Sequence, residues 1–162
     1  LNYNDPDNNM QIEMNFEMPE YKQYTDLKNN KFVESQELFG KRFLIKGKHE
    51  KKKWKMTTEI KTILGYPCQK ATTKGEKDLI EVWYTIAIPA KIGPREYHQL
   101  PGAVLEVSME EGRRTITATK IQFEKLEDGT ISAPKKGKKV SKEEFKKILE
   151  VFIERLLFRK MN

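Results

Sequence analysis

The sequence is poor in the residues that define several common functional classes. A single cysteine, Cys68, excludes an internal disulfide framework and any zinc site built from several cysteines of this chain. The nine glycines are scattered, so there is no glycine-rich loop to cradle a phosphate group. No apolar run approaches the roughly 20 positions that a membrane-spanning helix needs. The two histidines, His49 and His98, lack the spacing of metal ligands. The sequence therefore predicts no metal site and no cofactor.

Charge is abundant, and lysine dominates it. Charged residues make up 34% of the 162 positions, and the net charge is +7. Much of the excess lies in residues 46–55 and 135–147, which could attract phosphates or acidic surfaces, or could keep ordinary loops in solution. The length and the 37% hydrophobic content suffice for one core, so a single β-rich domain over residues 1–162 is expected.

Alternation of apolar and polar residues is typical of strands with one buried face. It is clearest at residues 10–18, and it recurs in the row Ile80, Val82, Tyr84, Ile86 and Ile88. Pro89 should end that row, because proline donates no hydrogen bond to a sheet. Strands are predicted at residues 21–26, 31–38, 42–46, 54–60, 68–73, 79–88 and 103–109, and a hairpin return at 113–123.

One helix is predicted, at residues 142–159. Ser141 and Glu144 have the spacing of a capping box, and Phe145 begins an apolar stripe at helical intervals. Many strands followed by one helix indicate a mainly β protein. We expect a curved antiparallel sheet or a partly open barrel, packed by this C-terminal helix.

The segment from Lys91 to Gln99 concentrates diverse functional side chains. Loops carried on rigid sheets often bind ligands, although a solvated loop would look the same in one sequence. The candidate binding residues are Arg95, Tyr97 and His98 of this loop, or Trp83 on the curved face of the sheet. A nucleophilic pair of Cys68 with His98 or His49 has no third orienting group, and a buried cysteine is the alternative.

A series of characteristic segments follows one another in a fixed order. It starts with Lys41–Ile45 and Trp54–Thr57, continues with Gly65–Ala71 and ends with Leu100–Leu105. This series resembles the GLPGLI family of Bacteroidota envelope proteins. Gln99 stands where that motif has its first glycine, so a left-handed backbone is not expected there. The residues that carry the resemblance, with a structural role implied, are Gly65, Tyr66, Cys68, Trp83, Tyr84, Pro89, Gly93, Pro94, Leu100, Pro101 and Gly102.

The resemblance implies export to the periplasm or the outer membrane, with any signal peptide removed, and further sequence upstream of Leu1. No reaction is assigned to that family, so no catalytic residue follows from it. We therefore expect a non-catalytic envelope protein that binds a protein or a small ligand, or that associates peripherally with a membrane, and no nucleic acid. The alternatives are an envelope hydrolase and an anion- or nucleic-acid-binding protein that uses the lysine clusters.

Overall fold

A computed structural model describes residues 2–4, 11–13 and 20–160 of the chain. The chain divides into two compact units. Unit 1 comprises Leu1–Lys22, Glu34–Ile45 and Pro134–Asn162, and unit 2 comprises Gln23–Val33 and Lys46–Ala133. The described part is mainly β with one C-terminal helix, as predicted, and its sheets do not close into a barrel. The expectation of a single domain stays a prediction.

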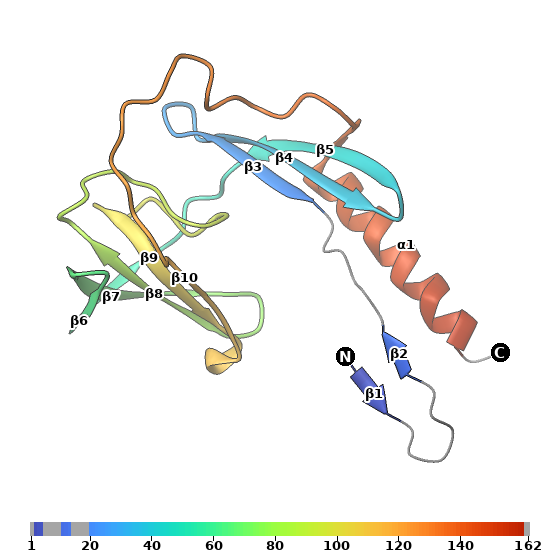
Figure 1. Cartoon of the computed structure of the whole chain (residues 1–162), viewed down its shortest axis with the longest axis horizontal. Helices are drawn as coiled ribbons and strands as arrows, with labels where there is room; N and C mark the ends of the chain where they lie inside the picture. The colour runs from blue at the N-terminus through green and yellow to red at the C-terminus, as the bar shows by residue number, and fades with distance from the viewer. Residues whose placement is uncertain (1, 5–10, 14–19, 161–162) are drawn as a thin grey trace. The chain divides into compact units, whose positions relative to one another are not determined.

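The larger sheet lies within unit 2 and has the order β10-β9-β8-β7-β6, with every neighbouring pair antiparallel (Figure 1). Two residues, Leu64 and Gly65, join β6 to β7, and both have positive φ, as a tight hairpin turn requires. The strands are β6 (Lys55–Ile63), β7 (Tyr66–Lys74), β8 (Leu79–Thr85), β9 (Ala103–Met109) and β10 (Arg114–Thr117).

A second sheet has the order β11-β5-β4-β3, and a separate pair is formed by β1 and β2. The strongest alternation in the sequence lies at residues 10–18. The structure describes only β2 within this range, and the rest lies outside the described residues. The strands are β1 (Asn2–Asn4), β2 (Gln11–Glu13), β3 (Tyr21–Asp26), β4 (Lys31–Leu38), β5 (Lys41–Lys48) and β11 (Lys138–Ser141).

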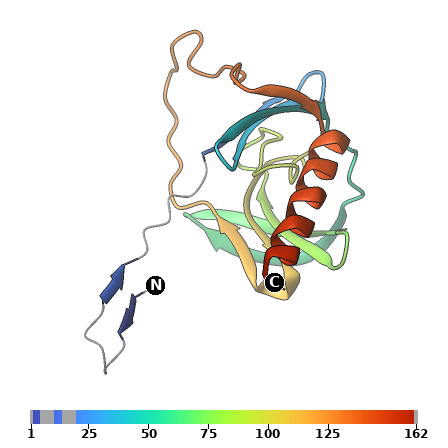
Figure 2. The same ribbon diagram turned by 90° about the vertical axis from the view of Figure 1, so that its right-hand side faces the viewer.

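Helix α1 (Lys142–Lys160) begins directly after β11 (Figure 2). The predicted capping box is present: the Ser141 N–H donates to Glu144 Oε2 at 2.6 Å, and the Glu144 N–H donates to Ser141 Oγ at 3.1 Å. Within unit 1, the Phe145 ring meets Phe43 edge-on at 5.5 Å between centroids. The start of α1 is therefore fixed both by its cap and by aromatic packing. No helix among the described residues has the length and apolar character needed to cross a bilayer.

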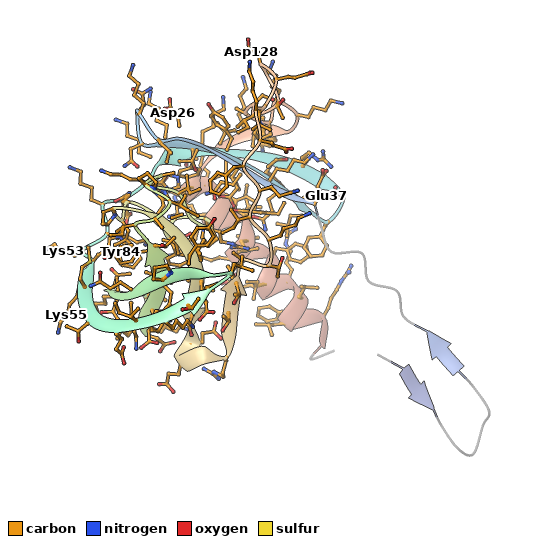
Figure 3. The ribbon with its side chains drawn as sticks, turned by 60° about the vertical axis from the view of Figure 1, so that its left-hand side comes forward. Asp26, Glu37, Lys53, Lys55, Tyr84 and Asp128 are labelled. Carbon is orange, nitrogen blue, oxygen red and sulfur yellow. The ribbon has the colours of Figure 1, made fainter. Side chains whose placement is uncertain are left out.

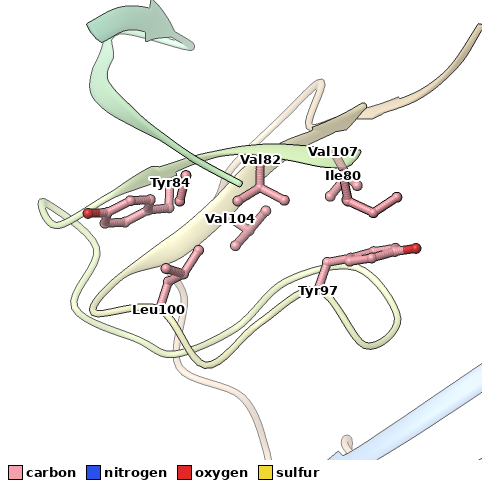
Figure 4. Close-up of a cluster of buried hydrophobic side chains, with 8 residues drawn as sticks. Ile80, Val82, Tyr84, Tyr97, Leu100, Val104 and Val107 are labelled. Carbon is pink, nitrogen blue, oxygen red and sulfur yellow. The ribbon is translucent and has the colours of Figure 1, made fainter. Parts of the chain in front are cut away.

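The core of unit 2 lies on both faces of the five-stranded sheet. On one face, Ile80, Val82 and Tyr84 are buried, as the alternation predicted, and Tyr97 and Leu100 pack against them from the loop after β8 (Figure 4). The opposite face carries a second cluster of buried residues: Ile63, Cys68, Ile88, Ala103 and Leu105. Figure 3 shows Lys53 and Lys55 at the periphery of this unit and Tyr84 inside it.

Four expectations differ from the structure. Strand β8 ends at Thr85, so Ile86 is 69% exposed rather than part of the core row. The return strand covers only Arg114–Thr117, because the chain leaves the sheet afterwards. Strand β11 arises within the lysine-rich stretch 135–147, where no strand was predicted. The apolar stripe of α1 is buried only at its beginning, since Leu157 is 58% exposed.

Substituting Gly102 should test how the loop is held on this sheet. A Cβ atom at Gly102 would lie 1.9 Å from the Thr85 carbonyl oxygen, so Gly102→Ala should lower the free energy of unfolding by about 3 kcal/mol or more. Gly65→Ala is the matched control: it has positive φ but nothing within 4 Å, and it should cost about 1 kcal/mol. Urea denaturation would measure both, and equal losses would contradict the steric argument.

Candidate functional site

The loop of residues 86–102 is anchored at both ends against the five-stranded sheet. The Ala103 N–H donates to the Ile88 carbonyl at 3.0 Å, and the Val104 N–H donates to the Ile92 carbonyl at 2.9 Å. Gly93 lies so close to the chain that a Cβ there would be 2.0 Å from the Tyr97 carbonyl oxygen. Backbone contact of this kind holds the loop in one position. The two residues that follow Tyr97, His98 and Gln99, are thereby fixed.

A pocket of about 350 Å³ opens beside this loop, entirely within unit 2. It draws on three parts of the chain: the turn after β3, the segment after β5, and the loop after β8. Its lining combines one apolar side chain with amides, ammonium groups and an imidazole: Leu27, Asn30, Lys51, Lys52, Lys91, His98 and Gln99.

His98 is the most deeply buried member of this lining, with 3% of its surface exposed. Its Nε2 atom has no hydrogen-bond partner among the residues that the structure describes. Its backbone carbonyl accepts a hydrogen bond from Trp54 Nε1–H at 3.1 Å, which fixes the main chain. Buried polar atoms are usually satisfied, so an unpartnered one on a residue that lines a pocket marks that residue as a candidate ligand contact.

The second histidine supports the first. The His49 and His98 rings meet edge to face, with centroids 4.5 Å apart and planes at 85°. His49 Nε2 lies 3.1 Å from Thr25 Oγ1, and the Asn30 side-chain amide donates to the His49 carbonyl at 2.7 Å. Phe32 packs against the His49 ring at 4.9 Å. These contacts fix the orientation of the His49 ring, which packs against the ring of His98.

Burial lowers the pKa of His98 below 6.5, because the imidazolium form loses its hydration. The charge of Lys52 lowers the pKa further, and that of Glu96 acts in the opposite direction. His98 is therefore neutral near pH 7, with one ring nitrogen able to donate a hydrogen bond and the other able to accept one.

Gln99 has φ of 74°, a left-handed backbone that was not expected at a residue with a side chain. Its amide explains how this conformation is held: Nε2 donates to the Glu50 carbonyl at 3.2 Å and to Asn30 Oδ1 at 3.5 Å. The expectation failed because local preference was judged without these partners, which are distant in the sequence. Strained backbone of this kind often occurs at binding sites.

The four predicted binding residues do not form one site. His98 lines the pocket, whereas Tyr97 is buried in the core and its hydroxyl contacts Met109 Sδ at 3.5 Å. Arg95 is exposed on the loop, with φ of 52°. Trp83 lies between Val82 and Tyr84 on β8, so its side chain is on the opposite face of the sheet.

Trp83 has a charged surround of its own. Lys61 Nζ lies 4.5 Å from the centroid of its ring and also pairs with Glu106 at 2.6 Å. Lys70 pairs with Glu59 and with Glu81, and the hydrogen bond that its ammonium donates to Glu59 is the largest cause of its raised pKa. These lysines are neutralised by carboxylates, unlike those of the pocket.

Cys68 does not pair with either histidine. It is fully buried in the cluster on the face opposite to Tyr97, and its Sγ–H donates to the Tyr66 carbonyl at 3.4 Å. Burial raises the pKa of this thiol above 9.0, so the reactive thiolate is scarce at neutral pH. The structure thus supports the reading of Cys68 as a small core residue.

Of the pocket residues, Lys91 and Gln99 belong to the segment that the sequence singled out, whereas Leu27, Asn30, Lys51 and Lys52 lie outside it. Lys51 and Lys52 are part of the lysine-rich stretch 46–55. No local pattern joins them to His98, since only the fold brings the three segments together.

Comparison with known proteins decides the family. Residues 6–146 match the family described as N-glycanase peptide, N-terminal domain (PNGase_F-II_N). The chain belongs to this family. A solved structure described as PNGF-II in the P21 space group aligns with a TM-score of 0.63 and 25% identity over 82% of the chain. A second, in the C2 space group, aligns with a TM-score of 0.62 and 26% identity over 82%. No curated protein matches.

Membership of the PNGase_F-II_N family corrects the resemblance drawn from the sequence, since neither comparison supports the GLPGLI family. The GLPGLI segments contain turn glycines, prolines and strand residues, which many β proteins need for the same mechanical reasons. The chain spans about a quarter of the length of the two PNGF-II structures, since the match covers 25% of each.

The protonation of His98 should make the domain less stable in acid. The unfolded chain protonates at the ordinary pKa of 6.5, whereas the folded chain resists protonation. The stability contributed by neutral His98 is thus fully present above the pKa of the unfolded chain. It is lost as the pH falls towards the lowered pKa of the folded chain. When the pH is lowered from about 7.5 to about 5.5, the melting temperature of His98→Gln should fall by less than that of the wild type. An equal loss in both proteins would contradict this assignment.

The Cys68 thiol should react with an alkylating reagent only when the fold opens. We expect negligible labelling of the native protein and complete labelling in concentrated urea, followed by mass spectrometry. Lys120→Cys in a Cys68→Ala background places the cysteine at an exposed position and gives the reference rate of labelling. Rapid labelling of Cys68 in the native protein would contradict its burial.

Proposed function

We propose that this chain is a non-catalytic recognition module of an N-glycanase-type protein and that it binds the glycan part of a glycoprotein. Family membership supports a role in N-glycan chemistry. The observation that carries the proposal is the lining of the pocket beside residues 86–102, which offers hydrogen-bonding amides, ammonium groups and the unpartnered His98 Nε2.

The same lining argues against hydrolysis at this place. Cleavage of a glycosylated amide needs a nucleophile or a polarised water together with a group that transfers protons. The pocket is lined by no carboxylate, hydroxyl or thiol, and Cys68 lies on the opposite face of the sheet. A rigid loop and preset donors suit binding, because little conformational freedom is lost when a ligand arrives.

Export to the periplasm or the outer membrane stays a prediction. It was inferred from the GLPGLI resemblance, and the correction of the family removes that support. Binding of a ligand belongs to this proposal, and the expectation that no nucleic acid is bound stays a prediction.

A soluble N-glycopeptide and the same peptide without its glycan provide the test. Isothermal titration calorimetry should give a dissociation constant in the micromolar to millimolar range for the glycopeptide and no binding for the bare peptide. His98→Gln should weaken binding about tenfold or more. Mass spectrometry of the mixture should show an intact glycopeptide.

The matched control is Lys53→Ala, because Lys53 is exposed and adjacent to Lys52 but does not line the pocket. This variant should bind the glycopeptide as the wild type does. Equal affinity for the two peptides would refute glycan recognition. Release of the glycan by the isolated chain would refute the non-catalytic role.

A further inference from the structure

The lysines of the pocket have no carboxylate partner among the residues that the structure describes, and the Lys52 Nζ atom lies 5.3 Å from the centroid of the Tyr97 ring. Lys51, Lys52 and Lys91 all line the pocket, and none of them forms an ion pair with the residues that the structure describes. Elsewhere in unit 2, Lys61 and Lys70 are each paired with carboxylates. Convergence of like charges around one concave surface raises the local concentration of anions.

The acidic groups nearby do not cancel this charge. No carboxylate lines the pocket. The charge of Glu96, on the loop, acts to raise the pKa of His98. Glu50 lies in the segment after β5, and its backbone carbonyl accepts a hydrogen bond from the Gln99 side chain. The lining itself therefore carries three ammonium groups and no carboxylate.

The unpartnered Nε2 atom of His98 is an independent observation that points to a ligand. This side chain is nine-tenths or more buried, and it lines the same pocket as the three lysines. In the tautomer that protonates Nε2, it donates a hydrogen bond to an acceptor in the pocket. A carboxylate or phosphate oxygen is such an acceptor, and its charge strengthens the bond.

Size and apolar lining indicate more than a small inorganic ion. A volume of about 350 Å³ falls at the lower end of the range for small-molecule sites. Leu27 supplies an apolar wall, and the Gln99 amide is anchored through its nitrogen to Asn30 and Glu50. A single sugar ring with a charged substituent would use the polar and the apolar parts together.

We propose that this pocket binds an acidic sugar, whose carboxylate or phosphate group is held by His98 Nε2 and the ammonium groups of Lys51, Lys52 and Lys91. The anionic part of this inference stands on the pocket alone, and the sugar part rests on the proposed function. Carboxylate and phosphate share the same chemistry here, namely negatively charged oxygens that accept hydrogen bonds.

Four probes separate the parts of the inference: glucuronate, glucose 6-phosphate, inorganic phosphate and neutral N-acetylglucosamine. Nuclear magnetic resonance titration of the full chain should shift the His98 ring signals with the two acidic sugars. These should bind about tenfold or more tightly than the neutral sugar, and the advantage should shrink as salt is raised. Inorganic phosphate should bind more weakly than glucose 6-phosphate, because it leaves Leu27 without contact.

Variants assign the charge to the pocket. Lys52→Ala and Lys91→Ala should each weaken glucuronate binding several-fold, whereas Lys53→Ala should leave it unchanged. His98→Gln should weaken glucuronate binding about tenfold or more, and circular dichroism would confirm that each variant folds. Equal effects of Lys52→Ala and Lys53→Ala, or equal affinity for glucuronate and N-acetylglucosamine, would overturn the anionic part.

The outcomes distinguish this inference from the proposed function. If inorganic phosphate binds as tightly as glucose 6-phosphate while no sugar acid or glycopeptide binds, glycan recognition fails and only an anion site stands. If the glycopeptide binds through its neutral sugars without dependence on the lysines, the proposed function stands and the acidic-sugar inference fails.

Discussion

The close backbone contact between the loop 86–102 and the five-stranded sheet is the constraint on which the candidate site depends. Gly93 and Gly102 both lie where a side chain would collide with a neighbouring carbonyl. Only at glycine can the loop approach so closely, and this approach places Tyr97 and Leu100 in the core. Burying these two apolar residues stabilises the sheet and, through the intervening positions, sets His98 and Gln99 at the edge of the pocket.

The candidate site is thus linked to the interior through four consecutive residues. Tyr97 and Leu100 are buried, whereas His98 and Gln99 between them line the pocket. Because the outer pair is held by packing, the inner pair needs little support of its own to keep a fixed orientation. Burial then keeps the imidazole neutral near pH 7 while the charge of the site resides on lysines closer to the solvent.

Much of the fold could be read from the sequence, since it follows from local rules. The alternation at Ile80, Val82 and Tyr84 identified buried strand positions, and the Ser141–Glu144 spacing identified the helix start. Ile86 continues the same alternation but lies outside the strand, because the end of β8 is set by the loop that Gly102 brings against Thr85. Strand β11 was not predicted, because lysine has little preference for strands. Its pairing with β5 decides its conformation.

The site was predictable only in part. The concentration of functional side chains singles out the segment that contains His98, and the structure places His98 in the lining of a pocket. Trp83, the other candidate, lies on the opposite face of the sheet, because alternate strand residues face opposite ways. Lys52 belongs to a lysine cluster that could attract anions, and Asn30 carries no local sign of binding, but the proximity of both to His98 is a property of the chain's path rather than of any segment. The family resemblance misled for a related reason: turn glycines and prolines record the mechanics of hairpins, which unrelated β proteins have in common.

The junction between β11 and α1 has a consequence for local motion in unit 1. Ser141 is both the last residue of the strand and the residue that caps the helix, so no linker separates the two elements. Loosening of the first helical turn frees the final strand residue as well, and fraying of the strand end removes the cap. Amide protons on the two sides of this joint are therefore exchanged with solvent through one common opening, rather than through two independent ones.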